Sequence, residues 1–280
     1  MQKYLSLILI FFIVLMFVSC KHTTNTTSEK LDITSEDTLD YDIFTLDTSD
    51  LSCKSKFKNC PSAKIRYAIF TTKDTSLDDF LNHEIKDGVL LKGDSTKFST
   101  VYDFVNDYFE GSRKMKFADD YDDESSKWEI ERNAEPLARI GNYITLQFYD
   151  YMYEGGAHPN AYTVFKTYDI TQKRQLKLEE LLNVNDTSLL SIGEHHFRKK
   201  NEVPDSLSLA DVAFFIFGDG EDFEDSKAYG KFHFNDNFAF TKDGIEFFYN
   251  TYEIGPYAVG TASFTIPYEQ VIPYLKIKIW

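Results

Sequence analysis

The sequence predicts an α+β protein in two parts, each combining antiparallel sheet with helices. Apolar residues at helical spacing are concentrated early in the chain, whereas from Trp128 onward they mostly alternate with polar residues, as in strands. The helical and strand-like segments do not alternate regularly. This argues against the parallel sheet of a βαβ protein and favours antiparallel sheets.

The first elements follow from local patterns. Residues 51–70 have strand-like alternation, and a helix is predicted from Ser76, with Asp79 as a capping-box residue. A second helix is expected from about Ser99, and the acidic stretch 119–124 marks its end or a loop.

The later part of the chain reads mainly as strands. The strand containing Ile144, Leu146 and Phe148 ends at the Gly155-Gly156 pair, because paired glycines favour a turn. The further predicted strands cover residues 163–170, 238–240, 245–252 and 261–266, and the further helices cover residues 187–200 and 267–275.

Composition restricts the classes of function. The chain has 280 residues, of which 42% are hydrophobic and 16% aromatic, so it can bury a large core and is not a disordered chain. It has 45 acidic and 30 basic residues, a net charge of −15. Such a chain repels phosphate backbones, so we expect no nucleic-acid partner and consider cationic partners instead.

The first twenty residues have the pattern of a bacterial export signal. Lys3 precedes an apolar run over residues 5–18 that is shorter than a membrane-spanning helix requires. The segment from Phe17 to Cys20 resembles a lipobox, which implies removal of residues 1–19 and lipidation of Cys20. We expect an exported protein, anchored by lipid to a bacterial membrane at the periplasmic or the cell-surface side. An uncleaved anchor or an ordinary signal peptide are the alternatives.

Residues 20–50 are rich in Thr, Ser, Asp and Asn and are predicted to form a flexible tether. Cys53 and Cys60 then remain as an even pair in an oxidising compartment, so we predict a disulfide that closes a small turn. A zinc site is not expected here, because no histidine is close to the two cysteines.

Several later segments, taken in order, resemble a known family. They are Tyr153–Asn160, Tyr168–Ile170, Leu176–Leu182, Asp243–Phe247, Tyr252–Gly260 and Ile266–Tyr268. This series is similar to the extracellular domain of RsiV-type anti-sigma factors. The same pairing of domains occurs in PdaC-type peptidoglycan deacetylases, ahead of their catalytic part, and in many exported lipoproteins. The resemblance covers roughly Cys53 to Leu275.

The resemblance implies a PdaC-type N-terminal domain over residues 51–153 and an RsiV-type C-terminal domain over residues 154–280. RsiV-type proteins bind lysozyme through this region. Only four residues precede the apolar run and the chain ends at Trp280, so we expect neither anti-sigma activity nor deacetylase catalysis. The expected function is a non-catalytic cell-envelope binding protein for a lysozyme-like or other cationic partner, or for peptidoglycan. The alternatives are a hydrolase or deacetylase accessory protein acting on wall glycan, and an envelope scaffold.

The first candidate binding segment surrounds His158, which follows two glycines in a loop. Tyrosines share one face of the preceding strand, and amphipathic aromatic residues suit sugar or protein surfaces. The alternatives are a purely structural His158 and a tyrosine stripe packed under a helix. The candidates are Tyr151, Tyr153, Glu154, Gly155, Gly156, His158 and Asn160, and Tyr149 belongs to the same stripe.

The second candidate binding segment is the loop 253–260, which Gly255, Pro256 and Gly260 make rigid. A rigid loop bearing aromatic residues loses little entropy on binding. The alternative is a buried crossover with Tyr257 in the core. The candidates are Tyr252, Glu253, Pro256 and Tyr257.

Other chemistry is not supported. The acidic residues between Asp219 and Asp225 do not have the EF-hand spacing, so we expect an acidic loop there and no calcium site. Ser55 and Lys58 fit S-x-x-K without its companion motifs, and G-x-S-x-G is absent. We predict no catalytic residue, metal or cofactor, although carboxylates paired in space for glycoside hydrolysis stay open.

Overall fold

A computed structural model describes residues 39–53, 59–91, 96–119, 127–217 and 229–279. The predicted signal peptide, Cys20, most of the predicted tether, the Ser55–Lys58 motif and the acidic loop 219–225 lie outside the described residues. Within the described residues, no helix is long and apolar enough to cross a membrane.

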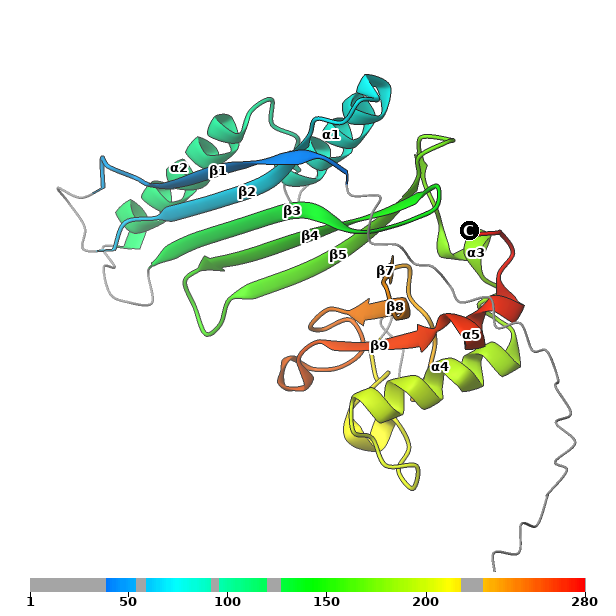
Figure 1. Ribbon diagram of the computed structural model, residues 1–280. Coiled ribbons are helices and arrows are strands. Elements are labelled where there is room, and N and C mark those ends of the chain that lie inside the picture. Colours follow the sequence, from blue (N-terminus) through cyan, green and yellow to red (C-terminus); the bar gives the residue numbers. More distant parts are fainter. Residues whose placement is uncertain (1–38, 54–58, 92–95, 120–126, 218–228, 280) are drawn as a thin grey trace, which may run out of the picture. The chain divides into compact units, whose positions relative to one another are not determined.

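The first sheet has six strands in sequence order (Figure 1). They are β1 (Tyr41–Ser49), β2 (Ser62–Phe70), β3 (Trp128–Ile140), β4 (Tyr143–Glu154), β5 (Asn160–Asp169) and β6 (Arg174–Gln175). All neighbours are antiparallel except β2 and β3. A parallel pair needs a long crossover, and α1 (Thr75–Leu90) and α2 (Val101–Asp119) supply it.

The helices α1 and α2 cover one face of this sheet. Leu81 and Ile85 of α1 are fully buried against Ile65 of β2 and Leu146 of β4. The apolar stripes of both helices therefore face the sheet, as their spacing predicts.

The starts of the two helices differ slightly from the prediction. The N-cap of α1 is Asp74, whose carboxylate accepts hydrogen bonds from Ser76 N and Leu77 N at 3.1 Å. The sequence predicts that the helix starts at Ser76, with Asp79 completing a capping box. The observed N-cap lies two residues earlier, so this prediction is wrong. In front of α2, Thr100 Oγ1 accepts from Asp103 N at 3.1 Å, so this helix begins just after the predicted Ser99.

The strand β1 lies inside the segment for which the sequence predicts a tether. The prediction of a tether over residues 20–50 is wrong for this part, because β1 pairs along its full length with β2. The Phe44 ring stacks on Tyr67 at 4.7 Å, and Leu46 packs against the same core. Only two apolar side chains of β1 face inward, too few to reveal the strand in a polar segment.

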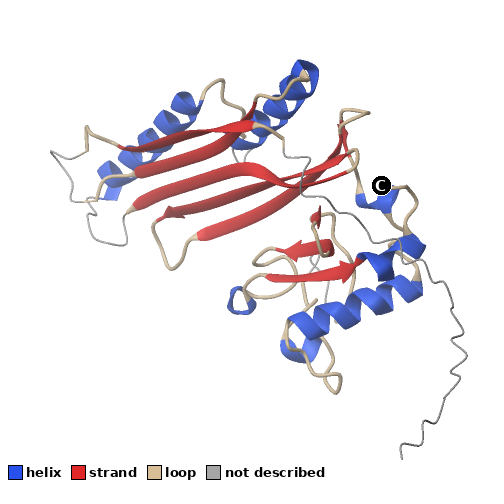
Figure 2. Cartoon of the chain, in the orientation of Figure 1, coloured by secondary structure: helices blue, strands red, loops and turns tan. Residues whose placement is uncertain are grey.

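The second sheet is antiparallel, with strands β7 (Phe238–Phe240), β8 (Gly244–Tyr249) and β9 (Ala262–Pro267). The helices of this part are α3 (Leu178–Leu181), α4 (Thr187–Lys200) and α5 (Tyr268–Val271), with short 3₁₀ helices at Ala210–Val212, Tyr257–Val259 and Ile272–Tyr274. The two sheets with their helices confirm the predicted α+β class (Figure 2).

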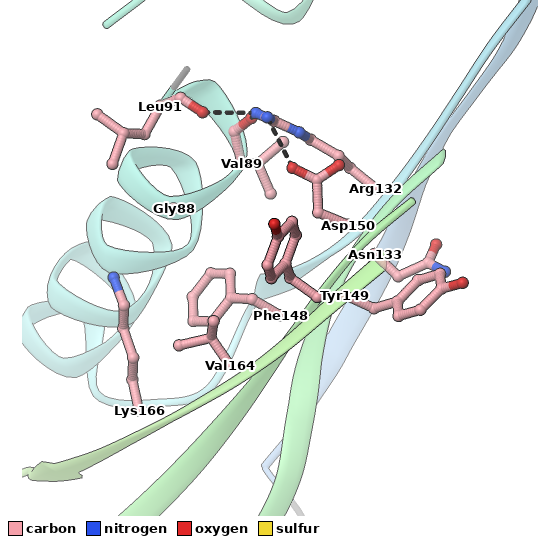
Figure 3. Close-up of a pocket in the computed structure, with 11 residues that line it drawn as sticks. Gly88, Val89, Leu91, Arg132, Asn133, Phe148, Tyr149, Asp150, Val164 and Lys166 are labelled. Atoms are coloured by element: carbon pink, nitrogen blue, oxygen red, sulfur yellow. Dashed lines mark hydrogen bonds and ion pairs between the residues drawn. The ribbon is translucent and has the colours of Figure 1, made fainter. Parts of the chain in front are cut away.

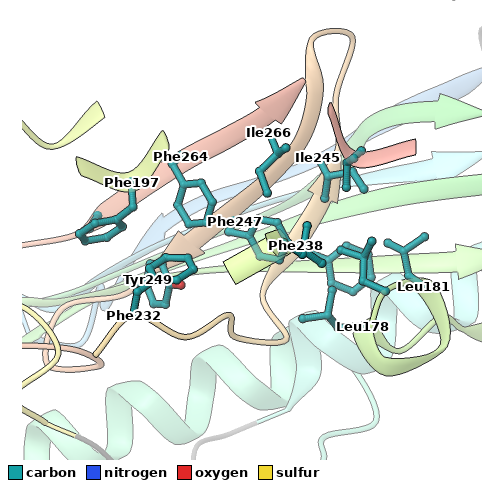
Figure 4. Close-up of a cluster of buried hydrophobic side chains, with 14 of the residues drawn as sticks. Leu178, Leu181, Phe197, Phe232, Phe238, Ile245, Phe247, Tyr249, Phe264 and Ile266 are labelled. Carbon is teal, nitrogen blue, oxygen red and sulfur yellow. The ribbon is translucent and has the colours of Figure 1, made fainter. Parts of the chain in front are cut away.

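The core of the second part combines a cluster of phenylalanine rings with leucine and isoleucine side chains (Figure 4). Phe197 of α4 is fully buried and makes edge contacts with Phe215 and Phe264 at 5.1 and 6.0 Å. Phe264 stacks on Phe247 at 5.2 Å. Aromatic pairs of this kind add to the stability gained from buried area, which explains part of the aromatic content of the chain.

Polar side chains join the two sheets. Asn250 Oδ1 accepts from Thr163 N and Asn237 Oδ1 accepts from Phe165 N, both at 2.7 Å. Thr145 Oγ1 accepts from Phe240 N at 3.2 Å. The first sheet continues through the β4–β5 hairpin. The predicted domain boundary between residues 153 and 154 therefore cuts through one sheet and does not separate two sheets.

The Cys53–Cys60 disulfide is present, with Cα atoms 5.5 Å apart, and confirms the predicted pairing. The turn it closes is tied to α2 through Asp50, which is 5% exposed. The Asp50 carboxylate accepts from Ser52 N at 3.0 Å and pairs with Arg113. Burial acts to raise the pKa of Asp50, but the Ser52 and Arg113 hydrogen bonds outweigh it and hold that pKa below its usual value.

We expect Asp50→Asn to lower the free energy of unfolding by about 2 kcal/mol at pH 7, because a buried charged hydrogen bond is lost. The folded pKa of Asp50 lies below its unfolded value. Its stabilisation is therefore complete above about pH 4 and lost as the pH falls through the folded pKa. Urea unfolding at pH 7 and pH 2.5 measures the difference. Asp47→Asn on exposed β1 is the control, and a difference that is independent of pH contradicts the assignment.

Candidate functional site

Two loops that are far apart in the sequence form one aromatic cluster, which consists of His158, Tyr252 and Tyr257. The His158 ring stacks on Tyr257, with centroids 3.8 Å apart and an interplanar angle of 18°. Tyr252 Oη lies 3.3 Å from His158 Nε2, and the two tyrosine rings are 5.7 Å apart. The structure therefore brings the two predicted binding segments together.

His158 lies in the turn that joins β4 to β5. Gly155 and Gly156 have φ angles of +88° and +96°, which residues other than glycine rarely adopt. Apart from the adjacent residues, no heavy atom of the described residues lies within 4 Å of where a Cβ atom would be at Gly156. The glycine is therefore required by its positive φ angle and not by close packing. The Tyr153 hydroxyl donates to Gly156 O at 2.9 Å, and His158 Nδ1 lies 3.1 Å from Pro159 O. These contacts hold the imidazole in place at the hairpin end.

The second loop is held by Glu253. Its carboxylate accepts from Asn250 N at 2.8 Å and from the side-chain amide of Asn235. Glu253 therefore positions the loop instead of pointing to a partner. Gly255 packs so closely on Ala213 O that no side chain fits.

The two tyrosines of the aromatic cluster remain accessible. Tyr252 is 47% exposed and Tyr257 is 40% exposed, so the alternative that places Tyr257 in the core is not observed. Pro256 is the N-cap of the 3₁₀ helix Tyr257–Val259. The restricted φ angle of Pro256 therefore limits the backbone conformations at the start of this short helix.

The predicted tyrosine stripe, Tyr149, Tyr151 and Tyr153, lies on the sheet face opposite α1 and α2. The intervening Phe148 and Met152 pack on the helix side. The three tyrosines are half-buried and are directly opposite Asn133, Glu131 and Glu129 of β3. Burial, then the neighbouring Glu131, raise the pKa of Tyr149, so its hydroxyl stays a hydrogen-bond donor at neutral pH.

The acidic residues beside the stripe are paired with bases of the same sheet face. Lys64 and Glu131 are 3.4 Å apart, and Arg66 and Glu135 are 2.6 Å apart. The remaining predicted residues, Glu154 and Asn160, are both exposed at the ends of β4 and β5. This face therefore combines aromatic rings, hydroxyls and exchangeable ion pairs.

The arrangement suits binding of a protein surface. Exposed tyrosines on rigid backbone provide contact area at low entropic cost and are common energetic centres of interfaces. In the described part of the chain, no group of three or more His, Cys, Asp or Glu side chains is placed to hold a metal ion.

Sequence reasoning identified both loops but not their contact, since nothing local relates residue 158 to residue 257. It also missed Arg132, which lies on the helix side of β3 between the buried Ile130 and Ala134. The available signal was a basic residue at an inward-facing position of an alternating strand.

Two family models match the chain. The model for deacetylase PdaC matches residues 54–161, in agreement with the PdaC-type domain predicted for the N-terminal part. The model DUF3298, described as a protein of unknown function, matches residues 130–269. No curated protein matches this chain. The RsiV resemblance stays a prediction.

Two solved structures have a similar fold. One is a DUF3298 family member from Bacteroides fragilis, with 22% identity and a TM-score of 0.66 over 85% of this chain and 93% of that chain. The other is a DUF3298 family protein from Pseudomonas aeruginosa, with 15% identity and a TM-score of 0.62 over 85% of this chain and 95% of that chain. The DUF3298 model covers half of the 280 residues, and the chain therefore belongs to the DUF3298 family.

Proposed function

We propose that this protein is an exported, lipid-anchored component of the bacterial cell envelope that binds a cationic partner protein and has no catalytic activity. The observation that carries the proposal is the aromatic cluster, in which one loop presents Tyr252 and Tyr257 at the surface against His158 of a second loop. The match to the PdaC model supports a role at the cell envelope.

The charge of the chain supports a basic partner. The net charge is −15, and glutamates flank the tyrosine stripe along β3. A cationic protein is drawn to such a surface, and its arginine and lysine side chains can exchange into the existing ion pairs and stack on tyrosine rings. A lysozyme-like enzyme is the specific partner we propose, on the basis of the RsiV resemblance.

We expect hen lysozyme to bind the purified protein at low salt, and Tyr257→Ala to weaken the affinity at least about tenfold, because an interface centre is lost. Tyr252→Asn should act similarly, since Asn tolerates the +70° φ angle of Tyr252. Calorimetry over a range of salt concentrations measures both effects, and binding should weaken as salt rises.

The matched control is Tyr102→Ala, which removes a tyrosine that is 60% exposed on α2, away from the aromatic cluster. If lysozyme does not bind at low salt, the lysozyme proposal is wrong. If it binds and the three variants behave alike, the aromatic cluster is not the binding surface.

The lipid anchor has its own test. We expect Cys20→Ser to abolish incorporation of radiolabelled palmitate in a bacterial host and to move the protein from the detergent phase to the aqueous phase on Triton X-114 separation, because the thioether-linked lipid is lost. Cys53→Ser, which retains Cys20, should still be labelled. Equal labelling of the Cys20→Ser variant would disprove lipidation at this residue.

A second candidate function rests on the PdaC match over residues 54–161. In this alternative the protein acts on wall glycan, or assists an enzyme that does, with His158 as the group nearest to substrate. Incubation with purified peptidoglycan, followed by assays for released acetate and soluble sugar, tests it. We expect no release from the wild-type protein. Release that disappears in His158→Ala would replace our proposal with this one.

A further inference from the structure

The helix-covered face of the first sheet contains a pocket that the proposed function does not use (Figure 3). It has a volume of about 280 Å³ and lies between the C-terminal end of α1 and strands β3 to β5. This size is near the lower end for small-molecule sites. Its lining includes Val89 and Leu91 at the end of α1, Arg132 of β3, Phe148 and Asp150 of β4, and Tyr162, Val164 and Lys166 of β5.

The back of the pocket is rigid because the Arg132 guanidinium makes four contacts with its surroundings. Its Nη1 donates to Val89 O and Leu91 O, both at 2.7 Å, and thereby satisfies carbonyls at the end of α1. Its Nη2 lies 2.8 Å from Asp150 Oδ2, and its guanidinium lies 4.3 Å from the centre of the Phe104 ring. The Asp150 carboxylate neutralises the charge of Arg132, which is only 8% exposed, so the pair forms part of the wall.

The floor of the pocket is apolar. The Phe148 ring lies against the backbone of α1 at Gly88, where no side chain could be accommodated. Tyr162 and Val164 of β5 are 47% and 38% exposed, so this side of the pocket is open to solvent. Figure 3 shows Phe148, Val164 and Lys166 pointing to the helix side of the sheet, whereas Tyr149 and Asn133 point away from it.

One charge at the pocket has no counterion. The Lys166 ammonium lies over the Phe148 ring, 5.0 Å from its centre, and no ion pair joins it to a carboxylate of the described residues. With Arg132 and Asp150 neutralising each other, the lining carries a net positive charge. This is the reverse of the chain as a whole, in which acidic residues outnumber basic ones by 45 to 30.

We propose that this pocket binds a small carboxylate with an apolar body. The body, a single ring or a branched chain, lies on Phe148 and Val164 beside Val89, where it removes apolar surface from water. The carboxylate accepts a charge-assisted hydrogen bond from Lys166 Nζ. The pocket opens on the helix side of β4, whereas the side chains of the tyrosine stripe lie on the opposite face of the sheet.

Three probes with the same ring test the charge preference: phenylacetate, 2-phenylethanol and phenethylamine, which are anionic, neutral and cationic. Methyl NMR spectra of the purified protein report binding through the signals of Val89 and Val164. We expect phenylacetate to bind most tightly. Lys166→Met should weaken phenylacetate about tenfold, because it removes the cation and keeps the length of the side chain.

The matched control is Lys64→Met, which removes a half-exposed lysine from the opposite face of the same sheet and should leave phenylacetate binding unchanged. The proposal is wrong if phenylacetate does not shift these methyl signals, if phenethylamine binds as tightly, or if Lys166→Met has no more effect than Lys64→Met. Lys166 is a surface residue of a folded strand, so the variant is expected to fold.

Discussion

The side-chain amides of Asn237 and Asn250 take the place of a neighbouring strand along β5. Each amide oxygen accepts a β5 backbone N–H at 2.7 Å, and both amide nitrogens donate to Thr163 O, at 2.8 and 3.0 Å. An unpaired strand edge exposes donors and acceptors that must be satisfied, and here the second sheet satisfies them. Asn250 precedes Tyr252 by two residues, and Thr163 follows His158 by five. The same bonds that close the sheet edge therefore place the two loops of the aromatic cluster in contact.

The aromatic cluster is rigid because each of its loops is fixed independently. The Glu253 carboxylate locks one loop through Asn250 N and the Asn235 amide, and two left-handed glycines with the Tyr153 hydroxyl fix the other. A surface of this kind has already lost the conformational entropy that binding would otherwise cost. This rigidity is the physical basis of the proposal that the two loops form a binding surface.

The two faces of the first sheet differ in the side chains that they present. Strict alternation along β4 places tyrosines on one face and Phe148 with Asp150 on the other. The tyrosine face adjoins glutamates that are paired with Lys64 and Arg66, whereas the helix-covered face holds the Arg132–Asp150 pair and the unpaired Lys166. The net acidity of the chain therefore does not extend to the pocket, where Lys166 leaves the lining with a net positive charge.

The sequence by itself determined the α+β class, the disulfide and the inward and outward positions of β4, because periodicity and spacing are local properties. It also identified the glycine-bounded loops at residues 155–158 and 253–260. It did not reveal β1. The strand has only two inward side chains, and they are stabilised by Ile65 and Tyr67 of β2, which are distant in the sequence. It placed a boundary at residue 154, although β4 and β5 belong to one sheet. Only the tertiary structure decided that His158 meets Tyr252 and Tyr257, and that Arg132 closes a pocket. Those contacts depend on hydrogen bonds between segments more than 40 residues apart, a separation over which no local pattern carries information.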